Sequence, residues 1–186
     1  MSRFAEDVAR WADQASVPRD GSPSGHRHGL FLTLVLLWRH PGLCATALFR
    51  ASVWADRHHL RGLPTVLERL NLTLFGIEIS SSLDIGPGLY LAHPGGVVIM
   101  ASRIGANASF IHAVTLGMRN RNEFPLIGDG VFIGAGARVL GGVRLGDGCR
   151  VGANAVVIDD VPAGATVAGV PARTVRERDV ARLVEA

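Results

Sequence analysis

The sequence predicts a mainly β protein, a parallel β-helix preceded by a helical N-terminal cap. An apolar residue recurs every six positions between Ile79 and Pro171, and a glycine follows many of these positions. A second small or apolar residue stands four positions after many of them, as Val131 and Ala137 do. The apolar anchors are Ile79, Ile85, Leu91, Val97, Ile104, Phe110, Leu116, Ile127, Ile133, Val139, Leu145, Val151 and Val157.

A period of six fits neither a hairpin strand, which alternates every two residues, nor an amphipathic helix, which repeats every 3.6. It indicates short strands joined by tight corners, with three hexads to one triangular turn of the coil. Each turn buries its anchors against the next turn and is not stable alone. We therefore expect a β-helix over residues 77–173 and a C-terminal tail or helix over residues 174–186.

The repeat is interrupted twice. Seven residues instead of six separate Val97 from Ile104, which predicts one bulged residue near positions 100–103. Eleven residues separate Leu116 from Ile127, which leaves about five surplus residues in a polar loop at positions 118–122. A loop extruded from a regular solenoid adds nothing to stacking, so a binding loop is favoured over a tolerated insertion.

Residues 1–76 lack the repeat. Residues 1–25 are expected to be a flexible segment, with a short helix at 4–15 and a linker that ends it. Residues 26–76 are expected to form the helical cap, with helices at 41–55 and 65–72 that each begin at or after a proline. The cap would cover the first coil or contact neighbouring subunits.

A membrane role for the cap is less favoured. The apolar run Leu30–Trp38 is too short to cross a bilayer, because a spanning helix takes about 20 residues. Contact with a membrane surface remains an alternative, through Trp38, Arg39, Trp54 and Arg57.

The composition narrows the function classes. The chain has no lysine, a pI near 9.6 and a net charge of +3, which permits an anionic ligand. No basic stripe with interleaved aromatic residues is present, which argues against nucleic-acid binding. Arg138, Arg144 and Arg150 are six residues apart, so we expect them on three different faces of the coil as solvated residues.

The start of the chain and its cysteines predict the compartment. Residues 1–20 are charged and lack the apolar region of a signal peptide. We therefore expect a cytoplasmic protein, in which cysteines stay reduced. Cys149 occupies a repeat position where other hexads carry Val or Ala, so we expect it to be a small core residue.

Five motifs lie along the coil region: Ile77–Ile99, Ala113–Gly117 (AVTLG), Ile133–Ala137 (IGAGA), Gly152–Val157 (GANAVV) and Ala168–Arg173 (AGVPAR). Together they resemble the serine acetyltransferase branch of the hexapeptide-repeat acyltransferases, over about residues 75–175. The resemblance implies a left-handed coil, a homotrimer, and acetyl-CoA bound as co-substrate in the groove between adjacent subunits.

This resemblance places His93 where the family keeps its general base. A neutral imidazole can take the proton from an acceptor hydroxyl as that hydroxyl attacks the thioester carbonyl. Glu78 stands where the family has an aspartate that orients the histidine, and a carboxylate there would select the ring tautomer and favour the imidazolium. A surface histidine without a role is the alternative, but the sequence Pro94-Gly95-Gly96 opens the corner beside His93.

His112 is predicted to lie near His93. It is two positions after the anchor Phe110, as His93 is two positions after the anchor Leu91. Because adjacent strands are about 4.8 Å apart, we expect the two imidazoles on one face of adjacent coils. His112 would then share contacts to the substrate with His93, or donate a hydrogen bond to the oxyanion or the acceptor. Two histidines without a third ligand make a poor zinc site, so no metal is expected.

The chain departs from the family pattern where an amino acid would be held. Glu123 and Phe124 stand where serine acetyltransferases have arginine and histidine, and Ala92 replaces the acid beside the base. The lost cation weakens recognition of a carboxylate, although Arg119 or Arg121 could compensate from the loop. The ring of Phe124 is better suited to stacking on a sugar or a carbon skeleton.

The same resemblance supplies candidate contacts to CoA. Gly117, Ala135 and Ala153 match positions where the family's backbone meets the pantetheine arm. Arg173 could meet the ribose phosphate, while the basic residues after it fit a solvated terminal helix equally well.

Taken together, these residues predict an acetyl-CoA-dependent O-acetyltransferase whose acceptor is the hydroxyl of a sugar, a glycan or a natural product. Two alternatives remain. One is a genuine serine O-acetyltransferase, and the other is a catalytically silent trimeric scaffold.

Overall fold

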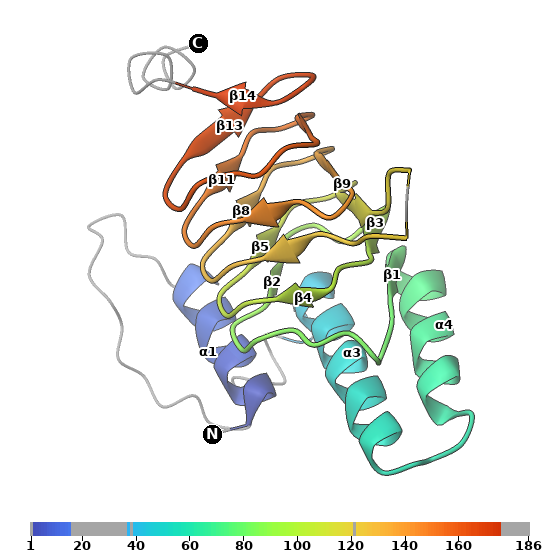
Figure 1. The fold of residues 1–186 in the computed structure, drawn as a ribbon. Helices are drawn as coiled ribbons and strands as arrows, with labels where there is room; N and C mark the ends of the chain where they lie inside the picture. Colours follow the sequence, from blue (N-terminus) through green and yellow to red (C-terminus); the bar gives the residue numbers. More distant parts are fainter. Residues whose placement is uncertain (1, 16–36, 38, 121, 176–186) are drawn as a thin grey trace.

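The computed structural model describes residues 2–15, 37, 39–120 and 122–175. Within these ranges, three helices precede a parallel β-helix, whose coils rise from the helices to β14 near the C-terminus (Figure 1). The helices are α1 (Arg3–Ala15), α3 (Pro41–Arg57) and α4 (Leu63–Phe75). None of the helices in the described part of the chain is long and apolar enough to cross a membrane.

Three parallel sheets form the sides of the coil, and the chain visits them in the repeating order A, B, C. Face A contains β1 (Ile77–Ile79), β3 (Val97–Ile99), β6 (Thr115–Gly117), β9 (Arg138–Leu140) and β12 (Val156–Val157). Face B contains β4 (Arg103–Ile104), β7 (Leu126–Ile127) and β10 (Arg144–Leu145). Face C contains β2 (Tyr90–Leu91), β5 (Ser109–Phe110), β8 (Phe132–Ile133), β11 (Arg150–Val151), β13 (Thr166–Ala168) and the antiparallel β14 (Arg173–Thr174).

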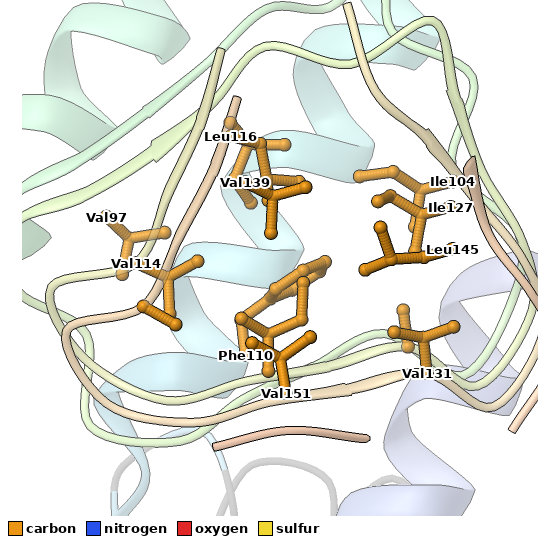
Figure 2. Close-up of a cluster of buried hydrophobic side chains, with 14 of the residues drawn as sticks. Val97, Ile104, Phe110, Val114, Leu116, Ile127, Val131, Val139, Leu145 and Val151 are labelled. Atoms are coloured by element: carbon orange, nitrogen blue, oxygen red, sulfur yellow. The ribbon is translucent and has the colours of Figure 1, made fainter. Parts of the chain in front are cut away.

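The anchors of the six-residue repeat fill the interior of the coil, as the sequence predicts. Figure 2 shows their side chains meeting inside the coil, with Ile104, Ile127 and Leu145 stacked along one side. Phe110 and Leu116 have no exposed surface, and neither does Cys149. Arg138, Arg144 and Arg150 lie on faces A, B and C respectively, as expected.

The first interruption of the repeat lies elsewhere than the sequence suggests. Ile99, not Val97, pairs with Ile79 below and Leu116 above. Leu91 to Ile99 is therefore eight positions instead of six, and Ile99 to Ile104 is five. The prediction of one bulged residue near positions 100–103 is wrong, because two extra residues lie in the corner between Leu91 and β3. Val97 misled the count because it is also apolar and buried.

All three helices have the predicted type, and α3 and α4 extend the predicted ranges at one or both ends. Helix α1 falls inside the stretch that we expect to be flexible, yet it packs against α3 and β2. Trp11 on α1 is 4% exposed and packs with Val8, Ala12 and Leu43. The apolar run at 30–38 lies almost wholly outside the described residues.

Hydrogen bonds from Arg50 on α3 and Asp7 on α1 join the cap to the open end of the coil. Arg50 donates to both carboxylate oxygens of the buried Asp7 and to the carbonyls of Ile85 and Gly86. Asp7 also accepts the backbone N–H of Leu89 at 2.8 Å. The first coil has no coil below it, so these carbonyl and N–H groups would otherwise be unpaired. The cap is thus a hydrogen-bonded end plate for the β-helix.

Candidate active site

Four predicted site residues form one column along the corner between faces C and A. Pairing of the face-C strands aligns Leu91 with Phe110, Phe110 with Ile133, and Ile133 with Val151. Each of these residues is followed two positions later by a predicted site residue. The column, in order along the coil, is His93, His112, Ala135 and Ala153.

The lowest residue of the column has an unusual backbone. His93 has φ 55°, in the left-handed region, which is uncommon for residues other than glycine, although asparagine, aspartate and histidine adopt it more often than the rest. On the coils above, the left-handed corner residues are Ala113, Gly136 and Asn154, each three positions after its aligned anchor. The two inserted residues bring this conformation to His93, and its side chain is exposed. Strain of this kind is often found at functional sites.

The inserted corner rests on the end of α4. Gly76 caps α4 with φ 65°, and its carbonyl accepts the N–H of Val97 at 3.1 Å. A Cβ placed on Gly76 would lie 3.2 Å from the nitrogen of Gly96 and 3.4 Å from the Cα of Gly95. The backbone of α4 and the His93 corner are therefore in close contact, which positions the corner relative to β1.

Glu78 lies at the middle of β1 and points outward on face A, opposite Val98 of β3. Among the described residues, no hydrogen bond or ion pair joins its carboxylate to His93. Glu78 instead lines a cavity of about 300 Å³ between α4 and the first coils, together with Arg69, Glu68 and Thr65. Glu78 and His93 are therefore in the same region, because Gly76, two residues before Glu78, contacts the His93 corner. They do not contact each other directly.

The residues of the extruded loop lie at the other end of face A. Phe124 accepts a hydrogen bond from the Ser102 hydroxyl through its carbonyl, at 3.0 Å, and its side chain is half-buried. It lines a cavity of about 210 Å³ with Met100. Arg119 lines a separate cavity of about 530 Å³ together with Glu123. Arg121 lies outside the described residues.

Two predicted CoA contacts also lie away from the column. Gly117 ends β6, at the end of face A opposite to His112. Arg173 is on β14 and forms an exposed ion pair with Asp159 at 3.2 Å. Within one chain, therefore, His93, His112, Ala135 and Ala153 come together, whereas Gly117, Phe124 and Arg119 lie at the far end of the three-residue strands of face A. The basic residues that follow Arg173 in the sequence, Arg176 and Arg178, lie outside the described residues.

Arg138 also lies at the column, although the sequence does not predict it as a site residue. Arg138 donates from Nη1 to the carbonyls of Ala113 and Gly136, each at 3.1 Å. These carbonyls directly follow His112 and Ala135. The only signal in the sequence was the hexad position that Arg138 shares with two other arginines, so its direction could not be predicted. In the described part of the chain, no group of three or more His, Cys, Asp or Glu side chains could hold a metal ion.

The chain is similar to known proteins along most of its length. Residues 124–159 match the family model described as bacterial transferase hexapeptide (six repeats). A serine acetyltransferase from Helicobacter pylori is 37% identical over 144 residues, which cover 75% of this chain and 84% of the relative. One from Synechococcus elongatus is 35% identical over 146 residues, which cover 76% of this chain but only 60% of the relative.

A solved structure agrees with these similarities. The structure of a serine acetyltransferase in complex with CoA superposes with a TM-score of 0.75 and 28% identity, covering 93% of this chain and 68% of that one. The similarity thus extends over the helical cap as well as the coil.

Proposed function

Because the chain belongs to the serine acetyltransferase family of hexapeptide-repeat transferases, we propose that it transfers the acetyl group of acetyl-CoA to an acceptor hydroxyl. The observation that carries the proposal is the column at the C–A corner. An exposed histidine stands at one end of it, and small residues that leave room for a pantetheine arm stand at the other. The similar structure that holds CoA supports the choice of co-substrate.

In this proposal His93 is the general base. Its ring nitrogen takes the proton of the acceptor hydroxyl while the hydroxyl oxygen bonds to the acetyl carbonyl carbon. When the carbon–sulfur bond breaks, the imidazolium returns the proton to the CoA sulfur. Glu78, which stands where the family has the aspartate that orients the histidine, is the positioning residue in this proposal, and its carboxylate would stabilise the imidazolium. His112, one coil above, would contact the acceptor.

For the acceptor, the comparisons favour serine over the larger hydroxyl compounds that we expected from the sequence. The relatives named above are serine acetyltransferases, and the identity to them is 35–37%. We therefore propose L-serine as the first candidate. A larger hydroxyl acceptor without a carboxylate is the second candidate. It is favoured by Glu123 and Phe124, which leave the loop without the family's arginine and histidine.

An acceptor panel separates these candidates. The purified protein is incubated with acetyl-CoA and with L-serine, homoserine, free sugars or oligosaccharides. Thiol release and the acetylated product are then measured, the latter by mass spectrometry. O-acetylserine as the main product supports the first candidate, and an acetylated sugar supports the second. CoA binding without transfer to any acceptor would instead support a silent scaffold.

We further propose that the enzyme is a homotrimer whose site is shared between two copies. His93 and Phe124 lie at opposite ends of face A in one chain, as do Ala135 and Gly117. One substrate can touch both sets only if a neighbouring copy supplies the second. An exposed apolar stripe along α4 supports self-association, because such a surface is unfavourable in water. The stripe is Leu63, Val66, Leu70 and Leu74, with exposures of 39%, 54%, 42% and 63%.

Mixed trimers test the shared site. A His93→Ala chain and a Gly117→Trp chain are each expected to be inactive. If one site uses His93 of one copy and Gly117 of the next, random mixing restores about a quarter of the sites. No recovery in trimers shown to be mixed would contradict the shared site. A stable monomer with full activity in sedimentation would contradict the trimer itself.

A further inference from the structure

Three arginines occupy the same place in successive hexads but have different surroundings. Arg138, Arg144 and Arg150 each directly precede a buried anchor, and each lies on a different face. The Arg150 guanidinium lies over the Phe132 ring on face C, 4.6 Å from its centroid. Arg144 makes a contact through its backbone, whose N–H donates to Oδ1 of Asp160 at 2.7 Å. Of the three guanidinium groups, that of Arg138 is bonded to the column at the C–A corner.

The Arg138 guanidinium is held in place by one of its nitrogens. Nη1 donates to two carbonyls on adjacent coils, those of Ala113 and Gly136, each at 3.1 Å. A guanidinium has five N–H groups. Within the described ranges, the N–H groups on Nε and Nη2 have no hydrogen-bond partner. Two backbone bonds therefore fix the orientation of the group, and its remaining donors are available to a ligand beside the column.

We propose that Arg138 binds the pantetheine arm of CoA by donating a hydrogen bond to one of its amide carbonyls. The proposal rests on the proposed function, which places the thioester at His93 and the arm along Ala135 and Ala153. The strand of Arg138, β9, is two coils above the His93 corner. Its guanidinium lies lower, because Nη1 donates to the carbonyl of Ala113 on the first coil above that corner and to the carbonyl of Gly136 on the second. At about 4.8 Å per coil, the guanidinium is therefore about 5–10 Å above the His93 corner.

This separation selects the part of CoA that Arg138 reaches. In an extended peptide-like chain with about 3.5 Å per residue, the second amide carbonyl of the arm is about 10 Å from the sulfur. The pyrophosphate is several bonds farther, about 16 Å from the sulfur by the same measure. A guanidinium between one and two coils above the thioester thus lies level with the amides of the arm and well short of the phosphates. Arg138 is a binding residue in this scheme and takes no part in proton transfer.

The test uses Arg138→Gln with Arg144→Gln as a matched control. Both residues are exposed and precede a buried anchor, so each variant should fold and melt as the wild type does. Dissociation constants are measured by calorimetry for CoA, and by ligand-observed NMR for pantetheine, which lacks the phosphates. A hydrogen bond from a charged donor is typically worth about tenfold in affinity or more. Arg138→Gln should therefore weaken both ligands about tenfold, whereas Arg144→Gln should leave both unchanged.

Each other result overturns the assignment in a distinct way. If wild type binds CoA and Arg138→Gln binds it equally well, the Arg138 contact is wrong and the proposed function is unaffected. If CoA binding weakens but pantetheine binding does not, Arg138 contacts a phosphate and the arm assignment is wrong. An equal loss in Arg144→Gln would show only a general effect of positive charge. If wild type binds neither ligand, the proposed function fails together with the inference.

Discussion

The backbone of His93 leads to a prediction that separates stability from activity. We expect His93→Asn to be folded, slightly more stable than wild type, and almost inactive. His93 has φ 55°, and this left-handed conformation costs a residue with a Cβ about 1–2 kcal/mol. Histidine and asparagine both adopt it more readily than most residues, but the short asparagine side chain can also hydrogen-bond locally in this conformation. Replacing the imidazole by an amide also removes the general base, which is worth about 10² to 10⁴ in rate.

The structure sets the size of the stability effect and offers a matched control. The relieved strain is at most about 1 kcal/mol, which corresponds to a rise in Tm of up to about 2–4 °C for a chain of this size. His59 has the same φ of 55°, in the turn between α3 and α4, and is exposed. His59→Asn should therefore raise Tm by a similar amount and leave turnover unchanged. Both are measured by thermal unfolding at one protein concentration and by steady-state acetyl transfer.

Two outcomes would refute this reasoning. A fall in Tm for His93→Asn, while His59→Asn gains stability, would mean that the imidazole of His93 stabilises the corner. It would then be a structural residue. A His93→Asn variant with wild-type turnover would remove the general base from the proposal.

Three further predictions concern the framework of the site. Asp7→Asn should lose about 3–5 kcal/mol of unfolding free energy in urea titrations, because it leaves the Arg50 guanidinium without its carboxylate partner. A loss below about 1 kcal/mol would show that the hydrogen bonds between the cap and the first coil are dispensable. Burial raises the pKa of the Cys149 thiol from 9.0 to about 11. Above pH 9 the unfolded thiol ionises before the folded one, so wild type should lose stability between pH 9 and 11, and Cys149→Ala should lose less. Gly76→Ala should lower both Tm and turnover, because the added Cβ would press on the His93 corner. Gly62→Ala, with φ 82° and no atom within 4 Å of its Cβ, should lower Tm alone. Unchanged turnover in Gly76→Ala would show that the contact between Gly76 and the His93 corner does not position that corner.

Much of the coil could be predicted because its repeat is local. Each hexad buries one anchor, so the period alone placed Phe110, Ile133 and Leu145 in the core. The same period gave the column, since residues two positions after aligned anchors share a corner. His93 and His112 could therefore be placed on adjacent coils without knowledge of any contact.

The misplaced interruption shows where this reasoning fails. Val97 and Ile99 are both apolar and both buried, so either could serve as the anchor of β3. Only the pairing of Ile99 with Ile79 and Leu116 decides between them. That pairing depends on neighbouring coils, which a count along one coil cannot include. The consequence is functional, because the two extra residues lie in the corner of His93.

Other features depend on contacts between distant segments. Asp7 and Arg50 meet only because α1 and α3 both pack against the first coil, 35 to 82 residues away along the chain. The direction of the Arg138 side chain depends on carbonyls of two different coils. Neither contact has a signature in the local sequence, since a period describes positions and not side-chain directions.

The most direct test of the account is a single-turnover measurement with radiolabelled acetyl-CoA, L-serine and saturating enzyme. Wild type and His93→Asn are compared, and CoA affinity is measured in parallel. We expect O-acetylserine from wild type, transfer slowed by about 10² to 10⁴ in the variant, and equal CoA affinity in both. Equal transfer rates, or a variant that fails only because it no longer binds CoA, would contradict the assignment of proton transfer to His93.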